Sequence, residues 1–140
     1  MIEGLNHLTF ATSDLERAFR FYRDVLGFRP LAKWARGAYF LAGREGAELW
    51  CCLSLDPDSR KTPHTDYTHT AFAVSPQNFE EASQKIRDSG APIWKENKSE
   101  GDSLYFLDPD GHKLEIHATS WRERLASTKI KPYDGMVFFE

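Results

Sequence analysis

The chain has 140 residues and a formal net charge of −3, and 41% of its residues are hydrophobic, enough to form a core. This length suits one domain that buries roughly two-thirds of the surface its unfolded form exposes. The mildly acidic balance argues against a nucleic-acid-binding surface, and no stretch resembles a membrane span or a signal peptide. We therefore expect a single cytoplasmic domain, residues 1–140, with no nucleic-acid or membrane partner.

The two cysteines, Cys51 and Cys52, are adjacent in a strand-like run. Neighbouring side chains of a strand point to opposite faces, so we expect no disulfide between them. Reduced thiols agree with a cytosolic protein, and packing is the simplest role for both.

The first half of the chain predicts a βαβββ unit. Residues 5–11 alternate as a strand does, which places His7 and Thr9 on one face. Ser13 and Glu16 form a capping-box pattern, and apolar residues then recur at helical spacing until Gly27. Three antiparallel strands joined by hairpin turns are expected to follow, near residues 33–34, 38–41 and 48–55.

The second half repeats this pattern after a polar linker, residues 56–66. The sequence His-x-x-Phe-Ala begins at His7 and again at His69, 62 residues later. Gly27 and Gly90, each expected to end a helix, are 63 residues apart, and a Tyr-Phe-Leu strand recurs after 66 residues. A small drift of this kind is what loop-length variation produces in a duplication, so we predict an α+β fold of two tandem βαβββ modules.

The predicted modules cover residues 1–56 and 66–119. Within the second, Ser75 and Pro76 suit a helix start, and strands are expected near residues 93–94, 103–107 and 113–118. Residues 120–140 are expected to form a short helix, Trp121–Leu125, and a tail whose apolar end suits packing on a second chain.

Two histidines and one glutamate form a candidate metal site. If the modules are equivalent, His7 and His69 occupy matching positions on their first strands. Glu115 lies on the last strand of the second module, and the spacing places Trp50 near the matching position of the first. Two imidazoles and one carboxylate can hold a divalent transition ion and leave positions open for substrate and water.

Simpler interpretations of these residues remain open. Glu115 shares a strand face with Lys113 and His117, so it is either a salt-bridged surface carboxylate or a ligand that competes with His117. His64 and His112, in the linker and in a turn, are expected to be solvated.

A loop rich in Lys, Asn, Ser and Gly precedes the Glu115 hairpin. It spans residues 94–103 and suggests a site for a small anion, because such a ligand needs cationic charge and hydroxyl donors. A solvated basic face is the simpler interpretation of Lys95, Lys98 and Arg124.

Six stretches closely resemble the fosfomycin-resistance glutathione transferases of the vicinal oxygen chelate superfamily. The resemblance covers essentially the whole chain. Its motifs lie at residues 4–9, 21–24, 66–69, 97–103, 105–112 and 132–136.

The resemblance implies a homodimer of paired modules that binds Mn²⁺ and K⁺. One chain would contribute His7 to each Mn²⁺ site and its partner would contribute His69 and Glu115. The K⁺ ion would lie in the loop of Asn97, Ser99, Glu100, Gly101 and Ser103.

The resemblance also implies where fosfomycin and glutathione bind. The phosphonate would contact Lys95, Ser99, Ser103, Tyr105 and Arg124, with Thr9 beside the epoxide and with Tyr39 and Trp50 on the thiol side. Thr9, Tyr39, Lys95 and Arg124 would be the catalytic residues. The expected reaction is attack of the glutathione sulfur on an epoxide carbon while a Lewis-acid metal stabilises the developing alkoxide.

Two departures from the family pattern leave the nucleophile open. Residues 44–47 look like a short insertion, and Lys98 stands where relatives commonly have Arg. The nearby Glu45 and Glu48 could reshape the thiol channel, so an epoxide hydrolase or a transferase of another thiol is the first alternative. An Fe(II) extradiol dioxygenase shares the ligand set but needs no anion site, and a drug-sequestering dimer resembling the bleomycin-binding proteins would need no metal.

Overall fold

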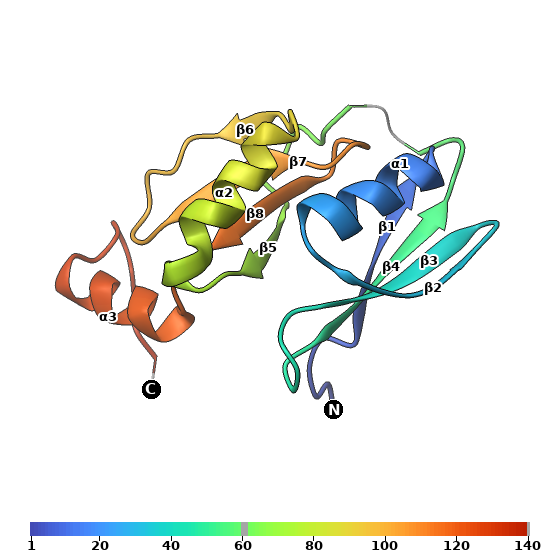
Figure 1. Cartoon of the computed structure of the whole chain (residues 1–140). Helices are drawn as coiled ribbons and strands as arrows, with labels where there is room; N and C mark the ends of the chain where they lie inside the picture. Colours follow the sequence, from blue (N-terminus) through green and yellow to red (C-terminus); the bar gives the residue numbers. More distant parts are fainter. Residues whose placement is uncertain (60–61, 140) are drawn as a thin grey trace.

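The computed structural model describes residues 1–59 and 62–139, which form two four-stranded sheets flanked by helices (Figure 1). The predicted α+β class and the tandem βαβββ order are confirmed. Part of the predicted linker, residues 60–61, lies outside the described residues. No described helix combines the length and apolar character needed to cross a membrane.

The N-terminal module has the sheet order β1-β4-β3-β2, in which β1 and β4 are parallel. Its elements are β1 (His7–Thr12), α1 (Leu15–Arg20), the π-helical turn η1 (Phe21–Val25), β2 (Arg29–Trp34), β3 (Gly37–Ala42) and β4 (Leu49–Leu55).

The C-terminal module has the equivalent order β5-β8-β7-β6, with β5 and β8 parallel. Its elements are β5 (Thr70–Ala73), the 3₁₀ turn η2 (Pro76–Asn78), α2 (Phe79–Asp88), β6 (Ile93–Lys95), β7 (Ser103–Leu107) and β8 (Lys113–His117). The last helix, α3 (Trp121–Ile130), lies at the far end of this module (Figure 1).

The strand register corrects one predicted equivalence. Tyr105 pairs with Glu115, whereas Tyr39 pairs with Cys52. Cys52, not Trp50, therefore occupies the position that matches Glu115. The error arose because the β3–β4 hairpin is longer and carries its extra residues at the turn. Trp50 lies two residues earlier in β4 and pairs with His7.

The first helix begins one residue later than the capping-box pattern predicted. Asp14 is the N-cap, and its Oδ1 accepts a hydrogen bond from the backbone N–H of Arg17 at 3.1 Å. Ser13 is not available as a cap, because both its N–H and its hydroxyl donate to Asp110. A cap pattern read from sequence cannot anticipate such a distant competitor.

The last helix extends beyond the predicted end at Leu125 to Ile130. Its start is a capping box, in which Ser120 and Glu123 bind each other's backbone N–H. The polar residues after Leu125 hid its second half from a periodicity argument, yet Thr128 is buried and donates to the Arg124 carbonyl at 3.0 Å.

An aromatic core lies between each sheet and its helix and continues from one module to the next. Tyr22, Phe40 and Phe106 are almost completely buried, and the rings of Phe21 and Phe106 approach across the module boundary with centroids 6.4 Å apart. The core supports the outer sheet faces, which carry the polar and aromatic residues described next.

Candidate active site

The C-terminal module carries a polar cavity of about 390 Å³ on its sheet. Several strands, the loop before β7 and helix α3 all contribute to it. Its lining includes Tyr67, His69, Lys95, Ser99, Tyr105, Glu115, His117, Thr119 and Arg124. The residues expected to bind metal or phosphonate thus meet in one place, although they are far apart in the sequence. They are His69, Lys95, Ser99, Tyr105, Glu115 and Arg124.

His69 and Glu115 are arranged as a pair that can hold a cation. The Nδ1 of His69 lies 2.7 Å from the Tyr67 carbonyl, which can only accept, so Nδ1 carries the proton. The Nε2 atom lies 3.0 Å from the Glu115 carboxylate oxygen Oε1. In the neutral imidazole two lone pairs would face each other, and a proton or a metal ion between them removes that conflict. The donor set therefore fits a divalent metal.

His7 has the same tautomeric preference but lies on the other module. Its Nδ1 is 2.7 Å from the Asn6 side-chain oxygen, which leaves Nε2 free, and its ring packs on Trp50 with centroids 4.7 Å apart. Among the described residues of one chain, no three His, Cys, Asp or Glu side chains gather closely enough to hold a metal ion. One chain therefore does not bring His7 together with His69 and Glu115.

His117, the competing ligand, is occupied by hydroxyl groups. Its Nδ1 lies 2.5 Å from Ser103 Oγ and its Nε2 lies 2.5 Å from Thr119 Oγ1. Ser103 also donates to Glu115 Oε2 at 2.7 Å. With partners at both nitrogens, His117 is better suited to fix Ser103 and Glu115 than to bind a metal.

Lys95, Tyr67 and Tyr105 form a cationic wall beside the His69–Glu115 pair. The Lys95 ammonium donates to the Tyr67 hydroxyl at 2.5 Å and lies 4.8 Å from the centre of the Tyr105 ring. The hydrogen bond to Tyr67 raises the pKa of Lys95, and burial raises the pKa of Tyr105. At neutral pH the wall offers one ammonium and one phenol donor to an anion. Tyr67 was missed by the sequence argument, although it lies two residues before His69.

The loop before β7 folds around the side chain of Asn97. The Asn97 amide donates to the Gly101 carbonyl at 2.8 Å, and its oxygen accepts from the N–H and hydroxyl of Ser99. Arg124 donates to the Glu100 carbonyl at 2.9 Å and so ties α3 to the loop. Gathered carbonyl and hydroxyl oxygens are the ligands a monovalent cation prefers. The loop therefore fits K⁺.

Gly101 is required at its position in this loop. Its φ of +81° lies in the left-handed region, and a Cβ there would approach Thr119 Cγ2 to 2.3 Å.

The N-terminal module presents an aromatic row on its sheet. Trp34, Tyr39, Trp50 and His7 follow one another from β2 to β1, with ring centroids 4.8, 5.3 and 4.7 Å apart. Thr9, expected beside the epoxide, is exposed and pairs with Cys52, which pairs in turn with Tyr39. Thr9, Tyr39 and Trp50 are thus brought together, on a different sheet from the cationic wall.

The two cysteines lie in different environments, as their alternation predicted. Burial raises the pKa of Cys51 to about 12 and makes it a core residue. Burial also raises the pKa of Cys52, and a hydrogen bond with Thr9 lowers it in part. Both cysteines are free thiols.

Neither Glu45 nor Glu48 lines the polar cavity of its own chain. Glu48 accepts a hydrogen bond from the Gly46 N–H at 2.9 Å within the β3–β4 turn, and Glu45 is exposed. Lys98 is also exposed and does not line the polar cavity.

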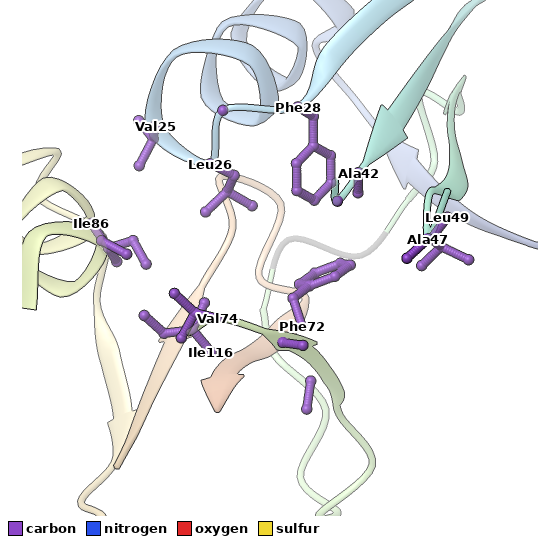
Figure 2. A pocket seen from close by; sticks show the side chains of 15 residues that line it. Val25, Leu26, Phe28, Ala42, Ala47, Leu49, Phe72, Val74, Ile86 and Ile116 are labelled. Carbon is purple, nitrogen blue, oxygen red and sulfur yellow. The ribbon is translucent and has the colours of Figure 1, made fainter. Parts of the chain in front are cut away.

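A second cavity, of about 460 Å³, lies between the modules (Figure 2). Among the described residues that line it, every side chain is aliphatic or aromatic, including Phe28, Phe72 and Ile116, apart from two glycines. The described residues of its lining offer no group for acid–base or metal chemistry, so the polar cavity is the candidate site.

Comparisons with known proteins identify the family of the chain. The sequence profile of the Glyoxalase/Bleomycin resistance protein/Dioxygenase superfamily matches residues 4–116. The chain is 50% identical to "Glutathione transferase FosA" of Serratia marcescens, over 99% of this chain and 96% of that one. It is 38% identical to "Metallothiol transferase FosB" of Shouchella clausii, over 98% and 94% of the two chains.

Solved structures of the fosfomycin resistance protein FosX from Listeria monocytogenes are similar as well. A complex with Mn(II) and sulfate has a TM-score of 0.73 at 28% identity, and it covers 89% of this chain and 99% of FosX. A mutant complex with Mn(II) and 1S,2S-dihydroxypropylphosphonic acid has a TM-score of 0.76 at 26% identity, with the same coverage.

Proposed function

Because the chain belongs to the Glyoxalase/Bleomycin resistance protein/Dioxygenase superfamily, we propose that it is a Mn²⁺-dependent glutathione transferase that inactivates fosfomycin. The observation that carries the proposal is the cavity in which a His–carboxylate pair adjoins a cationic wall. A metal beside an anion clamp suits a substrate that carries both an epoxide oxygen and a phosphonate.

His7 of one chain, with His69 and Glu115 of its partner, would hold the Mn²⁺ ion. When bound, the ion acts as a Lewis acid that stabilises the negative charge developing on the epoxide oxygen. The tautomers fit this role, since both histidines direct their Nδ1–H groups to oxygen acceptors. A homodimer is needed to complete the set.

The phosphonate would lie against Lys95, Arg124, Ser99, Ser103 and Tyr105. These groups supply two fixed positive charges and hydroxyl donors for its oxygens. The loop of Asn97 to Ser103 would bind K⁺, which adds positive charge behind this wall.

Thr9, Tyr39 and Trp50 would form the wall at which glutathione enters. The sulfur attacks an epoxide carbon, a C–S bond forms, the C–O bond breaks and the oxygen takes up a proton. The hydroxyl groups of Thr9 and Tyr39 can direct the thiol proton and stabilise the developing charges.

Water or a different thiol is the competing nucleophile, because a FosB metallothiol transferase and FosX are among the relatives. The FosA relative shares half of its residues with this chain, and Glu48, next to the insertion, already accepts a hydrogen bond from the Gly46 N–H. Both observations favour glutathione. The cationic wall disfavours a catechol dioxygenase.

The test is incubation of the purified protein with Mn²⁺, K⁺ and fosfomycin plus equal concentrations of glutathione, another low-molecular-weight thiol, or no thiol. Mass spectrometry of the products should show the glutathione adduct as the fastest product, and chelation of the metal should abolish it. A diol formed at the same rate without thiol would establish a hydrolase instead, and unchanged fosfomycin with stoichiometric binding would establish a drug-binding protein.

A further inference from the structure

The turn between β7 and β8 binds the N-terminal module through three side chains. Its residues, Asp108 to His112, belong to the C-terminal module, but their partners lie at the end of β1 and in α1 and η1. We call this set the clasp: Asp108, Asp110 and His112 on one side, and Ala11, Ser13, Arg17 and Tyr22 on the other.

Asp108 forms the buried part of the clasp. The hydroxyl of Tyr22 donates to Asp108 Oδ2 at 2.6 Å, and both residues are almost fully buried. The other oxygen, Oδ1, accepts the backbone N–H groups of Asp110 and His112, each at 2.9 Å. One carboxylate therefore fixes both the shape of the turn and its distance from η1.

Asp110 and His112 bind the chain where β1 ends. Asp110 Oδ1 accepts from the Ser13 N–H at 3.0 Å and from the Arg17 guanidinium at 3.1 Å, although Asp110 is only 4% exposed. His112 Nε2 donates to the Ala11 carbonyl at 2.7 Å, and its ring packs on Phe10.

A polar contact of this kind contributes orientation more than stability. Burying two carboxylates costs free energy that an apolar contact of the same size would not, and removing one partner leaves a buried group unsatisfied. In the clasp both oxygens of Asp108 accept hydrogen bonds, whereas Asp110 Oδ2 is buried without a partner among the described residues. The hydrogen bonds that are made are short and directional, so they specify one geometry. The apolar contacts around the cavity between the modules are non-directional, whereas the hydrogen bonds of the clasp are directional.

The clasp joins the strand that carries His7 to the strand that carries Glu115. Ala11 is four residues from His7 along β1, and His112 is three residues from Glu115 along β8. Both connections are short stretches of regular strand, so a rotation at the clasp moves His7 and Thr9 relative to Glu115.

We propose that the clasp is a positioning element for the metal site. It sets the distance from His7 of one chain to the His69–Glu115 pair of the partner chain. The inference rests on the proposed function, in which His7 and Glu115 of one chain serve different sites. The phosphonate wall needs no such help, because one module builds it entirely.

The test compares Mn²⁺ affinity with anion affinity in clasp variants of the full-length protein. Asp110→Ala removes the contacts to Ser13 and Arg17, Arg17→Ala removes one exposed partner only, and Asp110→Asn keeps an oxygen for Ser13. Asp24→Asn is the matched control, because Asp24 pairs with Arg23 inside its own helix. Titrations with Mn²⁺ and, separately, with inorganic phosphate in metal-free protein supply the two affinities, and circular dichroism supplies the folded fraction.

Asp110→Ala should lower Mn²⁺ affinity by about tenfold, as loss of a ligand-orienting contact does, while phosphate affinity stays near that of the wild type. The Mn²⁺ affinities of Arg17→Ala and Asp110→Asn should lie between those of Asp110→Ala and the wild type. The Mn²⁺ affinity of Asp24→Asn should match that of the wild type. If the affinities for Mn²⁺ and phosphate fell equally, in proportion to the unfolded fraction, the clasp would have a structural role only. Unchanged Mn²⁺ affinity in every folded variant would overturn the inference. Failure of the proposed function would appear earlier, as absence of Mn²⁺ binding by the wild type.

Discussion

The residue that best illustrates the chemistry of the site is His69. Its Nδ1–H is committed to a backbone carbonyl, so its other nitrogen faces the Glu115 carboxylate as a lone pair. An imidazole nitrogen and a carboxylate oxygen directed at one point are donor types that a divalent transition metal takes.

Lys95 and Tyr67 make the first prediction. Lys95→Ala should weaken fosfomycin binding by about 1.5–3 kcal/mol, the range of hydrogen bonds to charged groups. Tyr67→Phe should have a smaller effect at pH 7.5. The hydrogen bond from Lys95 to Tyr67 raises the Lys95 pKa, so without it the ammonium deprotonates at a lower pH. The fosfomycin affinity of Tyr67→Phe should therefore begin to fall at a lower pH than that of the wild type.

Calorimetric titration of both variants from pH 7 to 10.5 measures this effect. Lys129→Ala, which removes an ammonium from α3 outside the polar cavity, is the control. A Lys95→Ala protein that binds fosfomycin like the wild type would remove Lys95 from the phosphonate site.

At the scale of elements, the loop before β7 depends on a single glycine. Gly101 and Gly46 have nearly the same φ, +81° and +82°, but a Cβ at Gly46 would meet nothing within 4 Å. Each substitution by alanine carries a conformational cost of about 1–2 kcal/mol. Only Gly101→Ala adds a clash, with Thr119.

We therefore expect Gly101→Ala to raise the K⁺ concentration needed for half-maximal activity, while Gly46→Ala lowers the melting temperature without this effect. Rates measured over a K⁺ series in both variants test the assignment. Equal K⁺ dependence in Gly101→Ala and Gly46→Ala would show that K⁺ does not act through the loop before β7.

The hydrogen bond between η1 and the β7–β8 turn makes stability depend on pH. Burial, followed by the charge of Asp108, raises the Tyr22 pKa well above its usual value. Above about pH 10 the unfolded chain loses the Tyr22 proton and the folded chain keeps it. Since the unfolded state then binds fewer protons, the free energy of unfolding falls as pH rises through this range.

Tyr22→Phe should reduce this alkaline loss, and the part that remains comes from other groups with raised pKa values, such as the buried thiols of Cys51 and Cys52. At pH 7 the variant should be less stable by about 1–3 kcal/mol, because Asp108 loses a buried donor. Urea unfolding at pH 7 and pH 10.5 measures both effects, with the exposed Tyr133→Phe as control. A wild type and variant with parallel pH dependence would contradict the explanation.

On the scale of the whole molecule, each chain carries two incomplete surfaces. The C-terminal module has the charges and the His–carboxylate pair, and the N-terminal module has the aromatic row, Thr9 and His7. The strands β1 and β5 are edges of their sheets in the single chain (Figure 1). Pairing of such edges between two chains would bring complementary surfaces together.

A mixed dimer tests this arrangement directly. His7→Ala and Glu115→Gln homodimers should each be nearly inactive, because every site lacks one ligand. Co-expression should restore roughly a quarter of the wild-type rate, since half of the dimers formed at random are mixed and each mixed dimer has one intact site. A site confined to one chain predicts no restoration. Tagged mixed dimers, isolated and assayed, distinguish the two.

The sequence by itself determined the order of elements and most members of the site. Strand alternation, helical spacing and a repeat of about 62–66 residues are local or periodic properties, so they survive without knowledge of contacts. They predicted both modules, confirmed by the two sheets, and the metal candidates His69 and Glu115, which line the polar cavity. The resemblance to a family supplied Ser99 and Tyr105, and neither argument selected Tyr67 or Thr119.

Only the tertiary structure decided which distant groups meet. It placed Cys52 opposite Tyr39, turned Ser13 from a helix cap into a partner of Asp110, and took His112 out of solvent to bind the Ala11 carbonyl. Each outcome depends on a register or on a partner about 100 residues away, which composition and spacing do not encode. It also separated His7 from His69 and Glu115 in the single chain, because their strands belong to different sheets.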